Sequence, residues 1–483
     1  MIKMNIVRNV TCPVCGSLCD DIELSFKENK ILKVKNACAI GEAKFLNYHQ
    51  DRPKGPMVRK KGKLVDVSWE EAIKKSAEIL LKASYPILYG WSSTSCEAIK
   101  KGLELTEEVG GINDNTSTVC HGPSVLGIQD IGMSSCTLGQ LRHRTDLVIY
   151  WGSNPWGAHP RHTERYTLFT DGRFQRNTWK HYAAHSGITQ LRKRYLRIKE
   201  LTKSDSPPEI EKKTKQVHPM LPQKGRKMIV VDSRRTRSAD AADYFLQVNP
   251  NSDYELIQAL RMLVKGEELD LNEAAGISIE LLEEIVDVMI NCDLGILFFG
   301  VGLTMSLGKH RNIDAALSLV RDLNHRTKFL IMPMRGHFNV TGSNVVSLWQ
   351  TGYPFAVDFS RGYPQYNPGE TSVVDILSRG DSDAGLVIAS DPVSNFPKKA
   401  VENLIKNPLI VIDPIESLTS SLADVVLPST FVGIEDGGTA YRMDHVPLPL
   451  KKIVEPPIKL LSDEEILQRI ITEVKKIKSE RKQ

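Results

Sequence analysis

A cysteine and a histidine are adjacent in the segment STVCHGPS, residues 117–124. A thiolate serves as a nucleophile or as a soft metal ligand, and an imidazole exchanges a proton near neutral pH. Gly122 and Pro123 follow directly and favour a tight turn that would aim both side chains. The pattern suits a catalytic or metal-bound thiol at Cys120, and a plain core thiol is the alternative on these residues alone.

A second group of cysteines lies at the start of the chain. Four of the eight cysteines fall within the first forty residues and are separated by two, three and eighteen residues: Cys12, Cys15, Cys19 and Cys38. Zinc and a [4Fe–4S] cubane both accept four cysteines. Three thiols within eight residues fit a cubane better than the paired knuckles of a zinc ribbon, so we expect an iron–sulfur cluster here rather than zinc.

The overall composition is typical of a soluble globular protein. The chain has 483 residues, of which 41% are hydrophobic and 25% charged, enough for two to four domains. It has no run of about eighteen apolar residues, and its first residues match neither a secretory signal nor a twin-arginine leader. We therefore expect a cytoplasmic protein without membrane insertion, in which clustered thiols bind metal rather than form disulfides.

The elements that must position these residues follow one repeating pattern. Short apolar runs, each ending in a polar or glycine residue, alternate with helical patterns such as those at 68–83 and 253–266, and Ser68 with Glu71 matches a capping box. This alternation predicts parallel α/β sheets covered on both faces, with the polar strand ends grouped where such sheets bind ligands. Taken together these ends indicate a large, extended ligand, although any one of them is an ordinary turn. The six runs are TDLVIYWG, KMIVVDSR, DLGILFFGVG, KFLIMPMRG, AGLVIASD and PLIVIDP, and the run YPILYGW before them predicts a further short buried strand.

One segment interrupts the pattern and carries the basic excess of the chain. Residues 173–227 hold fifteen Lys and Arg against four Asp and Glu, so the remainder of the chain is net acidic. This distribution argues against nucleic-acid binding by the body of the protein. We expect a short basic helix and a flexible loop here, either as a docking surface for an acidic, ferredoxin-like subunit or simply as a solvated loop.

Seven motifs together carry a family resemblance. The N-terminal cysteine motif, VCHGPS, WGSNPWGAHP, VVDSRRTRSADAADYFLQVNPNSD, FFGVGLTMSLG, MPMRGHFNVTG and ADVVLPSTFVGIEDGGTAYRMD occur in the order found in molybdopterin oxidoreductases. Within that superfamily, which includes the formate dehydrogenases, the chain most resembles the catalytic B subunit of formylmethanofuran dehydrogenases. Two departures stand out, because the basic segment is longer than expected and the chain ends soon after PLPLKKIVEPP.

The resemblance implies an α/β fold with a small N-terminal iron–sulfur domain and two parallel-sheet domains. The C-terminal β-barrel of larger superfamily members is expected to be lacking here and carried by a separate, pterin-covering subunit. The implied domains are residues 1–60, residues 61–119 with 336–455, residues 120–335 with the basic insertion at 172–228, and a C-terminal helix or tail at 456–483.

The resemblance also implies a cofactor and a set of catalytic residues. A tungsten or molybdenum ion is held by two pyranopterin guanine dinucleotides and one protein ligand, for which Cys120 is the best candidate because Cys96, Cys136 and Cys292 lack the motif. His121 corresponds to the proton relay. Arg335 corresponds to the active-site arginine, whose guanidinium suits a carboxylate substrate; its alternative is an ordinary strand-end arginine.

The pterin contacts implied by the resemblance are strand-end residues. Lys44 matches a lysine placed between cluster and pterin, and a surface lysine is the alternative. Glycines in these loops permit close backbone approach, and their N–H groups suit phosphate. The remaining candidates are Gly152, Ser153, Asn154, Pro155, Asp232, Arg234, Thr236, Gly300, Gly302, Asp391, Glu435 and Thr439.

The activity implied by the resemblance is the reversible reduction of CO2 to formate, the first step of methanogenesis from CO2. Formate is then expected to pass to an amidohydrolase subunit that joins it to the amine of methanofuran. Two other readings are a stand-alone formate dehydrogenase and a non-catalytic iron–sulfur scaffold subunit of a respiratory complex. The presence of Cys120, His121 and Arg335 together favours a catalytic subunit over the scaffold.

Overall fold

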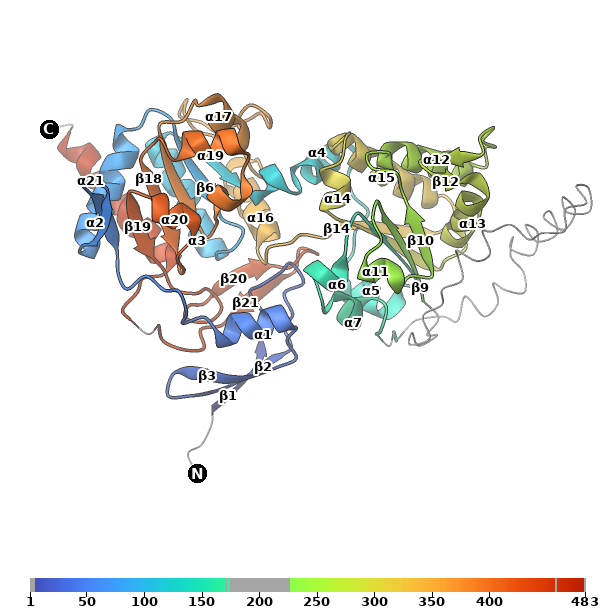
Figure 1. Cartoon of the computed structure of the whole chain (residues 1–483), viewed down its shortest axis with the longest axis horizontal. Coiled ribbons are helices and arrows are strands. Elements are labelled where there is room, and N and C mark those ends of the chain that lie inside the picture. Colours follow the sequence, from blue (N-terminus) through green and yellow to red (C-terminus); the bar gives the residue numbers. More distant parts are fainter. Residues whose placement is uncertain (1–4, 171, 174–225, 457, 482–483) are drawn as a thin grey trace, which may run out of the picture. The chain divides into compact units, whose positions relative to one another are not determined.

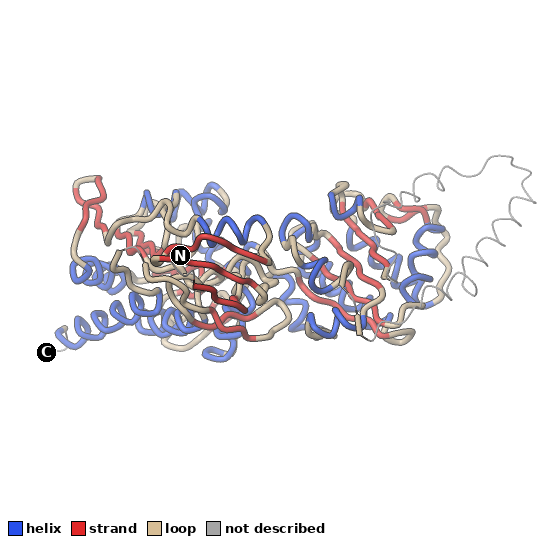
Figure 2. The backbone as a smooth tube through the Cα atoms, turned by 90° about the horizontal axis from the view of Figure 1, so that it is seen from below, coloured by secondary structure: helices blue, strands red, loops and turns tan. Residues whose placement is uncertain are grey.

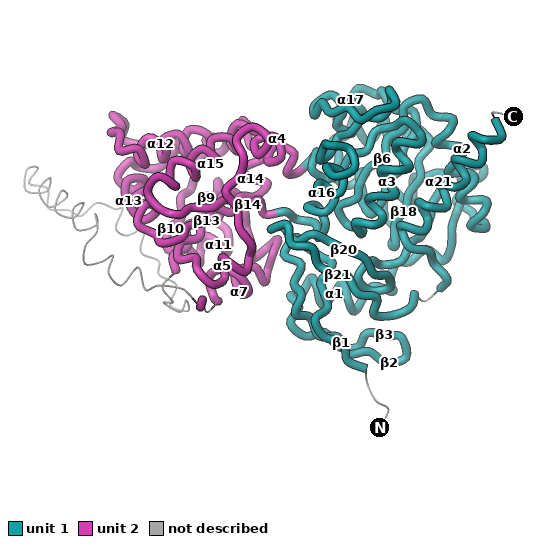
Figure 3. The backbone as a smooth tube through the Cα atoms, turned by 180° about the vertical axis from the view of Figure 1, so that it is seen from behind, with its two compact units in different colours: residues 1–119, 335–483 teal, residues 120–334 magenta. Residues whose placement is uncertain are grey.

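The computed structural model describes residues 5–170, 172–173, 226–456 and 458–481 (Figure 1). Most of the basic segment lies outside these ranges, and with it the helix, loop and docking surface predicted there. The chain divides into two compact units, which Figure 3 distinguishes by colour. The first unit is Met1–Val119 with Arg335–Gln483, and the second is Cys120–Met334. The finer domain boundaries expected from the sequence stay a prediction.

The first unit is built on a nine-stranded mixed sheet. Its five middle strands are parallel, and antiparallel strands extend both edges. In sheet order the strands are β16 (Gln365–Tyr366), β15 (Val357–Asp358), β7 (Ile112–Asn115), β6 (Pro86–Gly90), β17 (Ala384–Ile388), β18 (Leu409–Asp413), β19 (Val425–Pro428), β4 (Met57–Lys60) and β5 (Lys63–Asp66).

Both faces of the parallel strands are buried, which explains their unbroken apolar sequence. Leu386 and Ile388 of β17 pack toward α2 (Trp69–Lys82), α3 (Cys96–Val109) and α21 (Asp463–Glu480). Val387 points to the opposite face, which α17 (Val373–Arg379) and α19 (Lys398–Leu404) cover. Figure 2 shows helices on both sides of the strands.

The predicted start of α2 at Ser68 is confirmed, but only one of the two hydrogen bonds of the predicted capping box forms. The Ser68 hydroxyl accepts a hydrogen bond from the Glu71 N–H (3.2 Å), and the Glu71 carboxylate pairs with Lys60 of β4 (2.6 Å).

A small antiparallel sheet precedes these elements. It consists of β1 (Asn5–Val10), β2 (Ile22–Lys27) and β3 (Lys30–Lys35), followed by α1 (Ala39–Leu46). Its apolar residues share a core with Phe431 and Ile434, which precede the hairpin of β20 (Gly438–Tyr441) and β21 (Pro447–Leu450). The N-terminal sheet is thereby packed against the returning segment of the first unit, residues 431–454.

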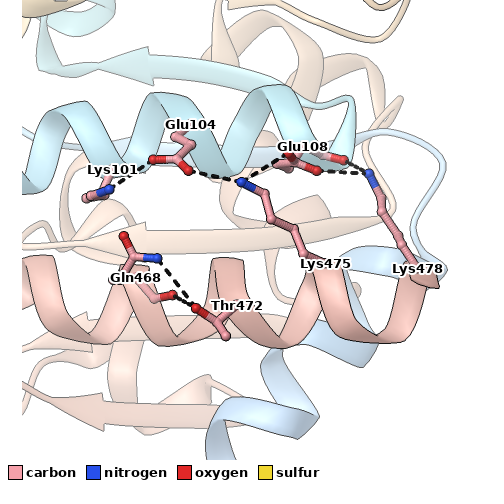
Figure 4. Close-up of polar contacts among 7 residues, drawn as sticks. All are labelled: Lys101, Glu104, Glu108, Gln468, Thr472, Lys475 and Lys478. Atoms are coloured by element: carbon pink, nitrogen blue, oxygen red, sulfur yellow. Dashed lines mark hydrogen bonds and ion pairs between the residues drawn. The ribbon is translucent and has the colours of Figure 1, made fainter. Parts of the chain in front are cut away.

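The C-terminal helix α21 lies along α3 and joins it by apolar and ionic contacts. Ile470 of α21 is fully buried in the shared core. On the solvent side, Lys475 lies 3.2 Å from the Glu104 carboxylate and 3.4 Å from that of Glu108, and Lys478 also reaches Glu108 (Figure 4). The predicted C-terminal tail is thus helical as far as Glu480.

The apolar contact should contribute most of the stability of this helix pair. We expect Ile470→Ala to lower the free energy of unfolding by about 2–5 kcal/mol, because it leaves a cavity in a close-packed core. Lys475→Ala should lower it by less than about 1 kcal/mol, since its ion pairs are half exposed and screened by salt. Thermal melts of both variants at low and high salt test the difference. Equal melting temperatures for the two variants would contradict it.

The second unit is built on a five-stranded parallel sheet. Its strands, in sheet order, are β10 (Tyr244–Gln247), β9 (Lys227–Asp232), β8 (Leu147–Trp151), β13 (Leu294–Phe299) and β14 (Lys328–Pro333). Ile149 and Leu297 face α12 (Asp253–Lys265), α13 (Ile279–Ile290) and α15 (His310–Leu323). On the other face, Tyr150 stacks on Phe298 (5.4 Å between ring centroids) near α7 (His162–Tyr166).

These sheets confirm the α/β fold class and place all seven apolar runs in parallel strands. The strand that precedes each candidate loop ends at the carboxyl edge of its sheet, as the sequence predicts. Across the described ranges, no helix combines the length and apolar character needed to span a membrane.

Candidate functional site

The predicted cluster cysteines come together in the first unit. Cys12, Cys15 and Cys19 lie between β1 and β2, and Cys38 caps α1. The Cys12 N–H donates to the Cys19 carbonyl (2.9 Å), which closes the loop. A Cβ on Gly41 would lie 3.1 Å from the Cys12 Sγ and 3.8 Å from the Cys38 Sγ. The glycine therefore leaves the space between the two thiols open.

The electrostatics of this cysteine group favour occupancy by a cation. Burial raises the pKa of the Cys12 thiol well above its usual range, and the nearby Cys19, Cys15 and Cys38 raise it further. Burial raises the pKa of Cys15 to about 11. Cys12 and Cys15, neither of which forms a disulfide, therefore ionise readily only when a metal compensates their charge. The donor set therefore fits a thiolate-bound cluster. No three His, Cys, Asp or Glu side chains in the described part of the chain lie close enough to share one metal ion.

Cys120 opens the second unit, directly before α4 (Gly122–Ile131). The turn after β13 holds its backbone in place, because the Thr304 hydroxyl donates to the Cys120 carbonyl (2.8 Å). Thr304 ends α14 (Val301–Thr304), which begins immediately after Gly300. The candidate metal ligand and a candidate pterin loop are therefore joined within one unit.

His121 is fully buried between two polar groups. Its Nε2 lies 3.2 Å from the Met334 carbonyl oxygen and its Nδ1 lies 2.9 Å from the Ser124 Oγ. Because a carbonyl oxygen only accepts, Nε2 carries a proton, and the Ser124 hydroxyl accepts or donates according to the state of Nδ1. This arrangement can hold the ring in either charge state, and the proton-relay role stays a prediction.

The other cysteines outside the cluster sit in different surroundings. Cys96 lies in the first unit beside Asn339, and burial raises its pKa to about 11. Cys292 is buried and donates to the Met289 carbonyl (3.1 Å), and burial raises its pKa strongly. Cys136 is half-buried and precedes α5 (Leu138–Arg144).

Arg335 is buried, with 3% of its surface exposed, at the start of the returning segment of the first unit. Its guanidinium donates to the Asn344 side-chain oxygen and lies 3.5 Å from the Val340 carbonyl. Asn344, on α16 (Val340–Thr351), is itself fixed by donating to the Ser117 Oγ (2.9 Å). This buried amide orients Arg335, and the sequence pattern did not single it out.

The loop that carries Cys15 lies directly against the Arg335 segment. Cys15 and His337 form a β-bridge, and the Gly16 N–H donates to the Gly336 carbonyl (3.2 Å). A Cβ on Gly16 would lie only 2.4 Å from the Arg335 carbonyl oxygen. Only a residue without a side chain allows this approach, so the cluster loop and the arginine segment are held in backbone contact.

The predicted glycine loops of the second unit interlock at the carboxyl edge of its sheet. Gly152 follows β8 with a φ of +55°, and a Cβ there would lie 2.6 Å from the Leu303 N. The Gly302 N–H donates to the Gly152 carbonyl (3.0 Å), and the Gly300 N–H to the Trp151 carbonyl (2.9 Å). The two loops leave no room for side chains where they cross, so glycine is required there for close backbone approach. The N–H groups of Gly300 and Gly302 are bonded to the other loop rather than turned to a phosphate, and the pterin contacts of these glycines stay predictions.

A substitution at this crossing tests the pterin assignment. We expect Gly152→Ala to lower the bound pterin about tenfold, because left-handed backbone costs a non-glycine residue about 1–3 kcal/mol and the methyl group clashes with the second loop. The measurements are GMP released by acid hydrolysis and the tungsten or molybdenum content. Gly139→Ala is the matched control, since a Cβ there meets nothing closer than 3.7 Å. Full pterin content in Gly152→Ala would contradict the assignment.

The loop after β9 joins the same edge. Asp232 accepts from the Arg234 N–H (3.1 Å), and Thr236 caps α11 (Arg237–Asp240). The Asn154 Oδ1, on the loop after β8, accepts from the Ser238 hydroxyl (2.6 Å). Ser153 and Pro155 on that loop are buried. The structure thus brings all the second-unit pterin candidates onto three neighbouring strand ends.

The remaining candidates belong to the first unit and have partners within it. Asp391, after β17, accepts from the Thr419 N–H (2.9 Å). The Thr439 hydroxyl donates to Glu97 (2.8 Å), and Glu435 forms a buried ion pair with Arg52 (2.9 Å). Asp391, Thr439 and Glu435 thus each stabilise the first unit through these contacts. Their roles toward the pterin stay predictions.

Lys44 lies at the centre of this part of the first unit. Burial lowers its pKa, Asp413 at the end of β18 raises it, Arg52 lowers it, and Cys12 raises it. Lys44 is therefore a partly buried cation that interacts electrostatically with Cys12, and its role beside the cluster stays a prediction. Asp413 ends one of the predicted strands, PLIVIDP. Arg52 and Asn344 lie in none of the motifs, because their importance comes from partners distant in sequence.

Comparisons with known proteins agree with this architecture. The molybdopterin oxidoreductase family model matches residues 52–184. The chain is 46% identical to the B subunit of the tungsten-containing formylmethanofuran dehydrogenase 2 of Methanocaldococcus jannaschii, and 44% identical to its counterpart in Methanococcus maripaludis. Each match covers 98% of this chain and 100% of the relative.

A solved structure shows the same fold. A chain in the crystal structure of the formyltransferase/hydrolase complex from Methylorubrum extorquens, bound to methylofuran, matches with a TM-score of 0.64 at 18% identity. The match covers 88% of this chain and 99% of that chain. At this identity the likeness concerns the fold alone.

Fold, strand-end loops and sequence likeness together define a molybdopterin oxidoreductase. Within that class, the chain belongs to the family of formylmethanofuran dehydrogenase B subunits, an enzyme family, at 44–46% identity over nearly its whole length. The resemblance predicted from the motifs is confirmed.

Proposed function

We propose that this chain is the subunit that interconverts CO2 and formate in a formylmethanofuran dehydrogenase. The reaction takes one CO2, two electrons and one proton to formate, and runs in both directions. The proposed cofactors are a tungsten or molybdenum ion on two pyranopterin guanine dinucleotides and a [4Fe–4S] cluster. The relatives from M. jannaschii and M. maripaludis are named as tungsten-containing, which favours tungsten here.

The observation that carries the proposal is the set of hydrogen bonds that connect Cys120 to the glycine loops of the second unit. Thr304 ties the Cys120 backbone to the turn after Gly300, and Gly302 crosses Gly152 at the same sheet edge. A soft thiolate beside crossed glycine loops at the carboxyl edge of a parallel sheet, where such sheets bind ligands, suits a pterin-bound metal. When bound, the metal would supply two-electron redox chemistry that no amino-acid side chain provides.

We assign metal ligation, electron delivery, proton transfer and substrate binding to different residues of the chain. Cys120 would ligate the metal, and the four N-terminal cysteines would hold the cluster that delivers electrons singly. His121 would give a proton to or take it from the reacting atoms, since its Nδ1 can exchange one with Ser124. Arg335 would bind the carboxylate of formate through two N–H groups, because Asn344 holds its guanidinium in a fixed orientation.

We propose that the chain works within a multisubunit, cytoplasmic complex. The expected partners are an amidohydrolase subunit that joins formate to methanofuran, a β-barrel subunit that covers the pterin, and ferredoxin-like subunits that supply electrons. Support comes from the names of the relatives, which are B subunits, and from the fold match to a chain of a formyltransferase/hydrolase complex.

Metal analysis of the complex purified from its native host tests the proposal most directly. We expect tungsten or molybdenum, two guanine nucleotides per metal, four irons for the N-terminal cysteines beyond those of other subunits, and an amidohydrolase subunit that copurifies. Low-temperature electron paramagnetic resonance of the reduced protein should show a [4Fe–4S] signal. Zinc without iron in the isolated chain would overturn the cluster, and active complex without tungsten and molybdenum would favour a scaffold subunit. Full formate activity without an amidohydrolase would favour a stand-alone formate dehydrogenase.

A further inference from the structure

Lys44 is held by an aromatic ring rather than by a carboxylate. It lies in the last turn of α1, and its Nζ sits 4.1 Å from the centroid of the Phe431 ring. Within the described ranges, no carboxylate lies at ion-pair distance from this ammonium group. Asp413 is its largest acidic influence, and burial raises the pKa of that carboxyl to about 7.

A buried ion pair holds the ring in turn. Phe431 is 5% exposed, and its N–H donates to the Glu435 Oε2 (2.9 Å). The same carboxylate accepts three hydrogen bonds from the Arg52 guanidinium, which also lies 4.7 Å from the Phe431 ring centroid. Arg52 further donates to the Ser429 carbonyl (2.9 Å), so both ends of the segment that carries Phe431 are tied down.

The two cations on this ring therefore differ in whether a carboxylate compensates their charge. The Arg52 charge is matched by Glu435 at hydrogen-bond distance. The Lys44 charge lies over the face of a neutral ring, whose quadrupole attracts a cation without cancelling it. A carboxylate in the place of Phe431 would hold the lysine equally well but would neutralise it. The ring packs in one core with Cys12 and Cys19, and it thus fixes the position of the ammonium group beside these thiols.

We propose that Phe431 is a positioning residue for Lys44 and that, through Lys44, it raises the reduction potential of the cluster held by the N-terminal cysteines. The inference rests on the proposed function, because it requires a [4Fe–4S] cluster at those cysteines. A cluster gains a negative charge on reduction, and a fixed cation nearby stabilises that reduced state. Arg52 and Glu435 act indirectly, by holding the ring.

The test measures the midpoint potential of the cluster by redox titration, followed by electron paramagnetic resonance, in the purified complex. The variants are Phe431→Leu, Phe431→Tyr, Lys44→Met, and the double variant Phe431→Leu with Lys44→Met. We expect Phe431→Leu to shift the potential to more negative values, in the direction of Lys44→Met. Phe431→Tyr should keep the wild-type potential, because its ring keeps the same face. The double variant should match Lys44→Met alone, since the ring acts only through the lysine.

Other outcomes separate the inference from the proposed function. An unchanged potential in Phe431→Leu, an equal shift in Phe431→Tyr, or a further shift in the double variant would each overturn the positioning role. Iron content of each variant controls for damage to the cluster, and Phe431→Met provides the same comparison if the leucine variant loses iron. A wild-type complex with no [4Fe–4S] signal from these cysteines would instead defeat the proposed function.

Discussion

The Cys120→Ser protein is expected to lose at least about a hundredfold of its formate activity and most of its tungsten or molybdenum. Loss of an outer partner of a metal ligand alone typically costs about 10–100-fold, and loss of the ligand itself should cost no less. A serine hydroxyl is a harder donor than a thiolate and is protonated at neutral pH. The measurements are formate oxidation with a viologen acceptor and metal content per chain.

Cys136→Ser is the matched control for this prediction. Cys136 lies in the same unit and is half-buried like Cys120, but it lies outside the VCHGPS motif. We expect it to keep its metal and activity. If Cys120→Ser kept both, Cys120 would be a structural thiol, and the search for the ligand would pass to Cys96, Cys136 and Cys292.

The Arg335→Lys protein is expected to keep its metals but to lose about 10²–10³ in kcat/KM for formate, the typical cost of removing one charge-stabilising donor from an active site. Lysine keeps the charge, but it lacks the planar pair of N–H groups that grips a carboxylate. It also cannot reproduce the guanidinium contact with Asn344 that orients the side chain. Steady-state kinetics over a range of formate concentrations, with metal analysis, measure the effect.

An exposed arginine gives the comparison for Arg335. Arg379 forms surface ion pairs with Asp381 and Glu370, so Arg379→Lys should leave the kinetics unchanged. If Arg335→Lys kept the wild-type kcat/KM, the role of Arg335 would be structural only, in the loop that contacts Gly16. A loss of metal from Arg335→Lys would mean that the substitution disrupts folding around the site.

Much of the fold was predictable because the parallel strands are buried on both faces. That burial forces unbroken apolar runs such as those of β8 and β17, and such runs stand out in any sequence. The antiparallel additions were not predictable. β4 and β5 pair with β19, and β15 pairs with β7, through backbone hydrogen bonds that leave little trace in side-chain pattern.

The candidate site was likewise predictable from the sequence only in part. Local motifs indicated the four cluster cysteines, Cys120 and the glycines, because metal ligation and close backbone approach each demand a particular residue type. The motifs could not show that Glu435 has Arg52 as its ion-pair partner, or that Thr439 bonds Glu97. Such pairs form between segments distant in the chain, and neither partner needs a distinctive neighbour in sequence.

The sequence by itself therefore determined the family, the α/β class and the candidate residues for binding metal and phosphate. Spacing and composition carry that information, since they reflect what each local segment must do. Only the tertiary structure decided that Gly16 lies on the Arg335 carbonyl, that Thr304 holds Cys120, and that Phe431 carries Lys44. These contacts are set by packing, in which the position of one side chain depends on every element that surrounds it.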